Sequence, residues 1–290
     1  MSKMRKSRNV QRARRLAALA LAFALALGLC GCGNGASDRE YRPITDVNDM
    51  EGRRVAVNLA WEADYLLSGR NDMTLVRYDT FADMILALNY NKVDAFAVDG
   101  LVWKVFEANS SGLARVEPPC GSVGYELYFS ADREALRDAF NAFLADYRRS
   151  EAYADHMARL ERFDGRAYVG PELPLTGTGA TLKVAVLPDG FPRAFIAAGE
   201  DVPTGFDLEA LKRFANEADY RLDFYFTSYD DLVHGLRAGS YDLAVGYLSD
   251  AYQKDVLAAG LLVSDLLDEI PIYFVEKTRE EISVALSELE

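Results

Sequence analysis

The feature that most constrains the fold is a repeated helix–turn–strand pattern. Residues 80–85 (TFADMI) align without gaps, at an offset of 148 residues, with residues 228–233 (SYDDLV), and the register continues to residues 93–95 and 241–243. Each copy starts with a hydroxyl residue suited to a helix N-cap, followed by an apolar-striped helix, a tight turn and a buried strand. The repeat predicts two units of similar architecture, but not a shared function.

Short apolar strands alternate with helices in both units. Strands are predicted at 55–57, 95–98, 182–187, 221–227, 242–247 and 271–275, and helices at 80–89, 207–217 and 228–238. A further helix, capped by Ser130, is predicted because apolar residues from Leu136 to Tyr147 recur at helical spacing. This alternation is typical of mostly parallel sheets with helices on both faces, so the predicted fold class is α/β.

The composition along the chain also suggests boundaries between segments. A stretch rich in Gly, Pro and Thr separates the two α/β units, and a short polar stretch precedes the first. The predicted organisation is a signal peptide (1–31), a tether (32–44), a first α/β domain (45–165), a linker (166–180) and a second α/β domain (181–290).

The first thirty residues indicate export. Residues 1–15 carry seven basic side chains and no acid, and the apolar run at 16–29 is too short to span a bilayer. Leu29-Cys30-Gly31-Cys32 resembles the lipobox of bacterial lipoproteins, which predicts lipidation of Cys32 and anchoring outside the cell membrane. The alternative is an ordinary cleaved signal whose cysteines are accidental.

Composition excludes several classes of function. The 290 residues are 50% hydrophobic and 27% charged, which suits two globular domains rather than a disordered chain. The net charge is −13, and without the seven basic signal residues 25 Lys and Arg face 45 Asp and Glu, so no nucleic-acid partner is expected. With two His and three Cys, neither a metal nor a cofactor is expected, and Cys120 is expected to be a buried thiol.

The second unit carries motifs of a known family. Residues 205–208 (GFDL), 228–243 (SYDDLVHGLRAGSYDL) and 248–254 (LSDAYQK) together resemble bacterial solute-binding proteins of the polar amino-acid importers, family 3. Residues 50–57 (MEGRRVAV) and 91–99 (NKVDAFAVD) resemble that family's second lobe. The resemblance implies a two-lobed periplasmic-binding-protein-like clamp, a small polar ligand, an ABC permease as partner and a monomer.

The order of the two units is unusual for this family, whose members run through the first lobe, the second lobe and a return segment. Here the block that resembles the second lobe comes first. Circular permutation accounts for this order, with residues 272–276 as a hinge strand. A fusion of two halves, or descent from a longer tandem array, is the alternative.

The resemblance also implies where a ligand would be held. Asp99 matches a position that pairs with a ligand ammonium, although it also suits a helix N-cap. Phe191 matches an aromatic wall, with a core position as the alternative, and Ser249 matches a hydroxyl position. Lys254 stands where the family has an arginine for the α-carboxylate, and lysine lacks the bidentate fork.

Three further residues depart from the family pattern. Trp61 and Glu62 belong to the stretch 60–62 (AWE), which stands where the family has Gly-Thr-Thr. Tyr247 replaces a glycine of the family and narrows the floor of the ligand site. A glutamate there would repel a carboxylate, whereas Glu62 and Asp99 would both attract an amine. The sequence therefore predicts a cationic or aromatic-containing small ligand rather than a standard α-amino acid.

Enzymatic function is not expected. The sequence contains no G-x-S-x-G, P-loop or dinucleotide-binding glycine motif, and His156 and His234 suit surface or packing positions. No catalytic residue is therefore assigned. The alternatives are a degenerate module or sensor acting through protein contact, which the altered carboxylate site favours, and a dehydratase-like enzyme on the same fold.

Overall fold

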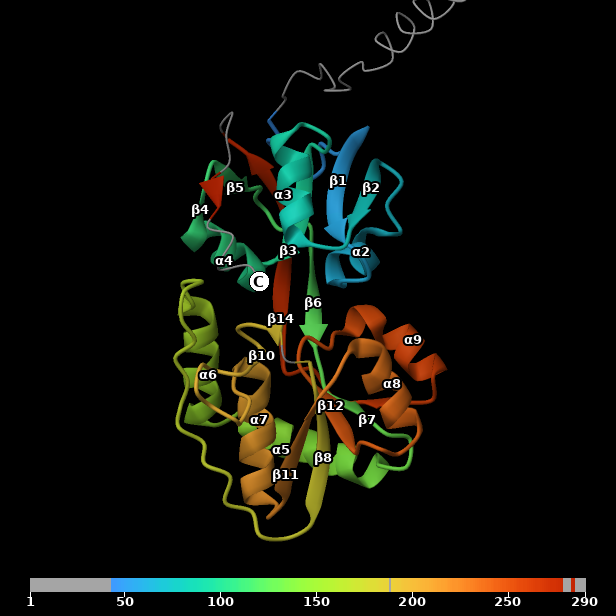
Figure 1. Ribbon diagram of the computed structural model, residues 1–290, viewed down its shortest axis with the longest axis vertical. Coiled ribbons are helices and arrows are strands. Elements are labelled where there is room, and N and C mark those ends of the chain that lie inside the picture. Colours follow the sequence, from blue (N-terminus) through green and yellow to red (C-terminus); the bar gives the residue numbers. More distant parts are fainter. Residues whose placement is uncertain (1–42, 188, 279–282, 285–290) are drawn as a thin grey trace, which may run out of the picture. The chain divides into compact units, whose positions relative to one another are not determined.

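The computed structural model describes residues 43–187, 189–278 and 283–284, all within one compact unit, Glu40–Glu290 (Figure 1). The predicted signal peptide, Cys32 and the tether as far as residue 42 lie outside the described residues. Within the described ranges, we find no helix with the length and apolar character needed to cross a membrane.

The first sheet has the strand order β2–β1–β3–β14–β5, and β6 also pairs with β14. Its parallel strands are β1 (Arg53–Asn58), β2 (Met73–Tyr78) and β3 (Ala95–Asp99). Strand β14 (Asp268–Lys277) runs antiparallel to β3, and it pairs antiparallel with β5 (Leu113–Arg115) and β6 (Gly121–Tyr125). We call this sheet and its helices, α2 (Glu62–Leu67), α3 (Phe81–Asn89) and α4 (Gly100–Asn109), lobe A.

The second sheet has the order β11–β8–β12–β7–β13. Strands β8 (Thr181–Val186), β11 (Arg221–Phe226) and β12 (Leu243–Val245) are parallel. Strand β7 (Tyr128–Phe129) pairs antiparallel with both β12 and β13 (Leu262–Val263). We call this sheet and its helices lobe B; the helices are α5 (Glu134–Tyr147), α6 (Glu151–Arg162), α7 (Phe206–Glu217), α8 (Tyr229–Arg237) and α9 (Gln253–Ala258). Shorter elements are β4 (Ser110–Ser111), β9 (Asp189–Gly190), β10 (Ala194–Phe195), β15 (Ser283–Val284) and the 3-10 turn η1 (Asp250–Tyr252).

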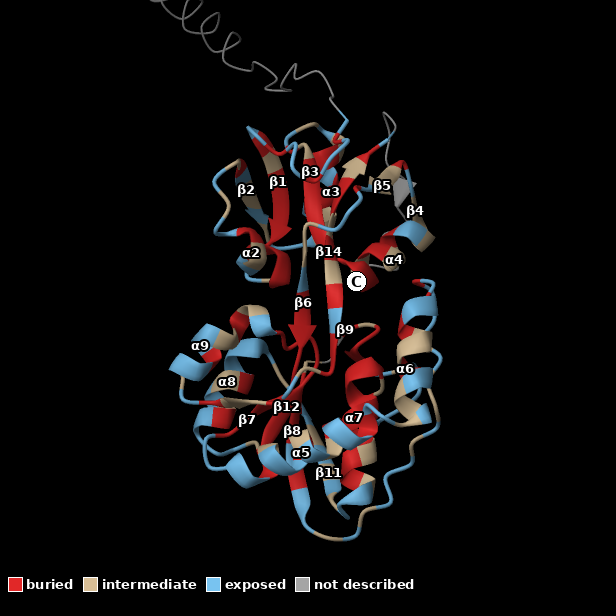
Figure 2. Ribbon diagram, turned by 180° about the vertical axis from the view of Figure 1, so that it is seen from behind, coloured by how far each residue is buried: buried red, intermediate tan, exposed pale blue. Residues whose placement is uncertain are grey.

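Helices cover both faces of each sheet because side chains alternate along the strands. In lobe A, Val55 packs in one cluster with Leu67 of α2, whereas the neighbouring Ala56 packs in another with Met84 of α3. In lobe B, α5 and α7 pack on one face, and α8 and α9 on the other. Buried residues follow the strands and inner helix faces (Figure 2). The predicted α/β class with two doubly covered sheets is confirmed.

The repeated unit is confirmed in atomic detail. The hydroxyl of Thr80 accepts a hydrogen bond from the Asp83 amide at 3.1 Å, and that of Ser228 accepts one from the Asp231 amide at 3.3 Å. In each lobe the first parallel strand then lies between the other two, in the orders β2–β1–β3 and β11–β8–β12. The predicted cap at Ser130 is wrong, because α5 begins at Glu134 and the Ser130 hydroxyl instead donates to Asp132.

The chain passes between the sheets at places other than the expected boundary over 166–180. The chain leaves lobe A after β6, and it is in the sheet of lobe B by residue 128. It returns to the sheet of lobe A at residue 268, where β14 begins. Helix α5 therefore packs with β8 in lobe B, although the expected first domain contained it, and β14 pairs with β3 in lobe A. An apolar stripe shows that a helix is buried on one side, but not which sheet covers it.

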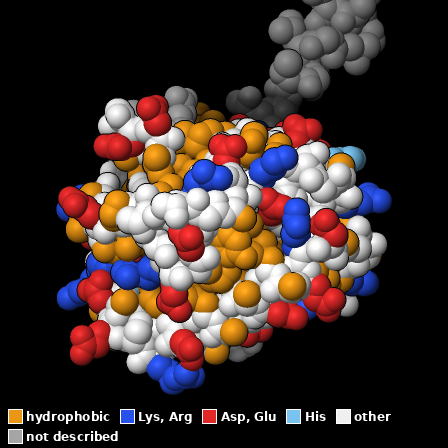
Figure 3. Space-filling model, turned by 90° about the horizontal axis from the view of Figure 1, so that it is seen from below, with side chains coloured by type: hydrophobic (Ala, Val, Ile, Leu, Met, Phe, Trp, Pro, Cys, Tyr) orange, Lys and Arg blue, Asp and Glu red, His pale blue; other side chains and the backbone are white. Residues whose placement is uncertain are grey.

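Charged side chains do not gather by sign on the face seen in Figure 3. Acidic and basic groups are interspersed there around an area of hydrophobic side chains. This face therefore presents no continuous basic surface of the kind that a nucleic acid backbone needs.

Candidate functional site

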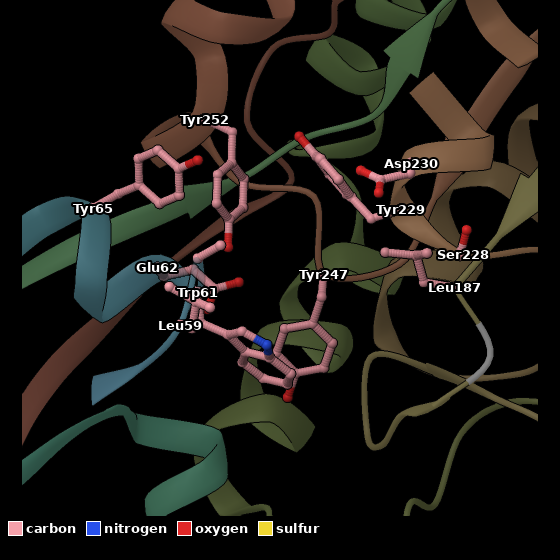
Figure 4. A pocket seen from close by; sticks show the side chains of 11 residues that line it. Leu59, Trp61, Glu62, Tyr65, Leu187, Ser228, Tyr229, Asp230, Tyr247 and Tyr252 are labelled. Atoms are coloured by element: carbon pink, nitrogen blue, oxygen red, sulfur yellow. The ribbon is translucent and has the colours of Figure 1, made fainter. Parts of the chain in front are cut away.

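A cavity of about 370 Å³ lies where the two lobes meet (Figure 4). Lobe A contributes residues that follow β1, and lobe B contributes residues that follow β8, β11 and β12. These are the carboxyl ends of parallel strands, where ligands bind in open α/β sheets. The described lining residues are Leu59, Ala60, Trp61, Glu62, Tyr65, Leu187, Ser228, Tyr229, Asp230, Tyr247 and Tyr252.

Aromatic rings from both lobes form the walls. The ring centroids of Trp61 and Tyr247 lie 5.9 Å apart, and those of Tyr65 and Tyr252 lie 4.7 Å apart in an edge-to-face contact. Tyr229 lies 5.7 Å from Tyr252. Figure 4 shows the Tyr252 ring directed toward Glu62 and Trp61. Each of the first two contacts joins lobe A to lobe B, so the cavity walls exist only when the lobes meet.

The local backbone places two of these rings. Ala60, just before Trp61, and Tyr247 itself have positive φ angles of 59° and 48°, which turn the chain sharply after β1 and β12. Non-glycine residues adopt this conformation at an energetic cost. At Tyr247 the strain is held in place by its amide, which donates to Asp207 Oδ2 at 3.0 Å.

Glu62 is a buried acidic residue of the lining. Its side chain is 3% exposed, and it forms no ion pair among the described residues. Burial, and secondly the nearby charge of Asp99, raise the pKa of Glu62 to about 8. The described lining contains no Lys, Arg or His, so no group of the cavity wall neutralises this carboxylate.

The structure brings three of the predicted site residues together, Trp61, Glu62 and Tyr247, around this cavity. Asp99 is not part of its lining. One oxygen of Asp99 accepts from the amides of Leu101 and Val102 at 2.7 and 2.8 Å, and the other accepts from the Tyr125 hydroxyl at 3.3 Å. Asp99 thus performs the N-cap role of α4.

The other three predicted residues also lie outside the lining. Phe191 is partly buried and packs on Phe163 and Phe195, with centroids 5.7 and 5.1 Å away. Ser249 is fully buried, and its hydroxyl has no hydrogen-bond partner among the described residues. Lys254 lies exposed on α9.

Sequence analysis missed Arg193, which lies fully buried between the lobes. Its guanidinium pairs with Asp207 at 2.6 Å and with Asp268 at 2.9 Å. Burial alone would raise the pKa of Asp268, but Arg193 and His156 hold it below its usual value. A single arginine in a loop rich in Gly and Pro carries no pattern that would have identified this cluster.

A second buried polar cluster holds α6 against α7. Arg159 donates two hydrogen bonds to Glu209, at 2.7 and 2.6 Å, and Tyr168 donates one at 2.7 Å. His156 lies 3.3 Å from the same carboxylate and is itself buried. Burial opposes ionisation, but these partners hold the pKa of Glu209 at about 2. His156 is thus a buried neighbour of two carboxylates, Glu209 and Asp268, whereas His234 is exposed. Cys120 is only partly buried.

Comparison with known proteins finds a family match within lobe B. Residues 182–257 match the family model of "Bacterial extracellular solute-binding proteins, family 3". No curated protein matches the chain.

Several solved structures are similar at low identity. The GluR0 ligand-binding core in complex with L-glutamate is 14% identical, over 79% of this chain and 86% of that one, with a TM-score of 0.38. Arginine-bound ArgBP from T. maritima is 14% identical, over 78% and 87%, with a TM-score of 0.34. The probable binding protein ytmK from Bacillus subtilis is 10% identical, over 80% and 86%, with a TM-score of 0.40. The similarity to the family 3 extracellular solute-binding proteins is thus shown for residues 182–257, which lie in lobe B.

Proposed function

We propose that this chain is an extracytoplasmic solute-binding lipoprotein, anchored to the membrane through Cys32, that captures a small polar ligand for an ABC importer. The observation that carries the proposal is the cavity of about 370 Å³ lined from both lobes at the carboxyl ends of their parallel strands. The family 3 match over residues 182–257 supports the same role. Binding alone is sufficient for this function, and we assign no catalytic residue.

The proposed mechanism is ligand-dependent closure. A solute that touches Trp61 of lobe A and Tyr229 of lobe B stabilises the arrangement in which the lobes meet, by its greater affinity for that state. The two strand crossings, after β6 and before β14, are the places at which one lobe can rotate against the other. The closed surface is what a permease would recognise.

We also propose that the chain is a circular permutation of the family's lobe order. The family match begins at residue 182, in the first parallel strand of lobe B, although all three parallel strands of lobe A precede it. Residues 163–180 connect α6 to β8 within one lobe, as expected of a segment that joins former termini.

Thermal unfolding of the whole processed chain in mild detergent tests the binding function. The panel contains amino acids, amines, small peptides and organic acids. A solute held at about 100 times its Kd adds ~2.7 kcal/mol of stability and raises Tm by several degrees. Leu187→Trp, which fills the cavity, is expected to abolish this rise, whereas Leu175→Trp in the linker keeps it. If no solute raises Tm, the chain is instead a degenerate module that acts through protein contact.

A further inference from the structure

We propose that the cavity between the lobes binds an organic ammonium ion, with Glu62 as its counter-ion and the rings of Trp61, Tyr247 and Tyr252 as its walls. This inference rests on the proposed solute-binding function and names the class of ligand. It assigns Glu62 as the residue that selects for positive charge.

The walls have the chemistry of a cation site. Five aromatic side chains line one cavity: Trp61, Tyr65, Tyr229, Tyr247 and Tyr252. The faces of such rings attract cations, and enclosures of several aromatic rings recognise quaternary ammonium ligands. The ionisable acids of the described lining are Glu62 and Asp230, and this lining has no Lys, Arg or His, so it offers no cationic partner for a carboxylate.

The position of Glu62 supports this assignment. The side chain is 3% exposed and lines the cavity, yet no described cation forms an ion pair with it. An ionised carboxylate in such surroundings is costly unless a positive charge is present. Two other buried carboxylates have a cationic partner, since Asp268 pairs with Arg193 and Glu209 with Arg159. Because Glu62 lines the cavity and has no cationic partner among the described residues, a cation bound in the cavity could pair with its carboxylate.

Binding of a cation would be coupled to release of a proton. Glu62 faces the charges of Asp99 from β3, Arg193 from the loop before β10 and Asp207 from α7. The hydroxyls of Tyr125, Tyr247 and Tyr252 also lie within its electrostatic reach. Because these surroundings place the pKa of Glu62 at about 8, the free chain holds this carboxyl mostly protonated at pH 7. A bound ammonium favours the ionised form, so one proton passes from Glu62 to the solvent.

Calorimetric titration of the whole chain with matched probes tests the inference. The cationic probes are choline and putrescine, and 3,3-dimethylbutan-1-ol is the uncharged isostere of choline. The variants are Glu62→Gln and, as a matched control, Glu126→Gln. Glu126 is also buried, and burial raises its pKa to about 7, but it does not line the cavity. Neutral and acidic amino acids complete the panel.

We expect at least one cationic probe to bind about tenfold more tightly than the uncharged isostere. Glu62→Gln should weaken that binding about tenfold or more, and Glu126→Gln should leave it within about twofold. In wild type, binding at pH 7 should release about one proton, measured by comparing buffers of different ionisation enthalpy, and affinity should rise by up to about 100-fold from pH 6 to pH 9.

The other outcomes separate the two proposals. If only a neutral or acidic solute binds, the ammonium inference is overturned while the solute-binding function stands. If a cationic probe binds equally well to Glu62→Gln, the role of Glu62 is wrong. If no member of the panel binds, both proposals fail.

Discussion

The guanidinium carbon of Arg193 lies 3.5 Å from the centroid of the Tyr125 ring. Tyr125 ends β6, the strand by which the chain leaves lobe A, and Asp268, which pairs with Arg193, begins β14, by which it returns (Figure 1). One buried arginine of lobe B thus contacts both crossing strands. Arg193 therefore ties both crossing strands to lobe B through its pair with Asp207.

Replacing this arginine should destabilise the chain strongly. Arg193→Met leaves Asp207 and Asp268 buried without the guanidinium that pairs with both. The free energy of unfolding should fall by about 3 kcal/mol or more. The matched control is Arg149→Met, because Arg149 pairs with Asp146 on the exposed surface and such pairs contribute roughly 0–1 kcal/mol. Chemical denaturation measures both. Equal effects of the two substitutions would contradict the structural role of Arg193.

Glu62→Gln should stabilise the chain at high pH. The pKa of Glu62 is raised to about 8 by burial, so the folded chain keeps a proton that the unfolded chain releases near its ordinary value of 4.5. The free energy of unfolding of wild type therefore falls as the pH rises through this interval, by up to about 1.4 kcal/mol per unit of pKa difference.

The amide side chain introduced by Glu62→Gln has no proton to lose, so the Tm difference between variant and wild type should be small at pH 5 and grow to several degrees at pH 9. Thermal unfolding across this range, without ligand, measures it. A Tm difference that does not change with pH would show that Glu62 is ionised in the folded chain.

Glu209 should have the opposite pH dependence. Burial raises the pKa of Glu209, but hydrogen bonds from Arg159 and the nearby imidazole of His156 lower it to about 2, so the ionised form stabilises the fold above pH 4.5. That contribution is lost as the pH falls toward 2. Glu209→Gln should therefore be less stable than wild type at pH 7, and the two should converge at low pH. A destabilisation that stays constant down to pH 2 would contradict this account.

Removing the helix cap of the repeat should have a small, local effect. Thr80→Ala deletes the hydroxyl that accepts from the Asp83 amide, which should cost about 1 kcal/mol, whereas Thr80→Ser keeps the acceptor and should cost less. Denaturation of both variants measures the difference. Equal losses would mean that the methyl group of Thr80, not its cap, matters.

The sequence was informative wherever a pattern repeats. Thr80 and Ser228 could be identified as caps because a hydroxyl precedes each apolar helix. Strands β3 and β8 could be identified because each contains an apolar run, at 95–98 and 184–186. Which lobe holds α5 could not be predicted, because its stripe suits any sheet face. Ser130 is not the cap because α5 begins only at Glu134, and the Ser130 hydroxyl donates a hydrogen bond to Asp132 instead.

The candidate site was only partly predictable. Trp61, Glu62 and Tyr247 stood out because they depart from a family pattern at strand ends. Tyr65 and Tyr252 had no such signal, since each is an ordinary aromatic residue on a helix or turn until the two lobes meet. Contacts between segments far apart in the sequence require the fold itself.

The most direct test of the account uses the two tryptophans of the chain. Trp61 lines the cavity, whereas Trp103 is buried in the core of lobe A. In Trp103→Phe, Trp61 is the sole tryptophan, and a solute that raises Tm should change its fluorescence in a saturable way. In Trp61→Phe, the emission of Trp103 should stay constant over the same titration. Binding in the cavity between the lobes would be contradicted if the fluorescence of Trp103→Phe did not change. It would also be contradicted if the fluorescence of both variants changed by the same amount.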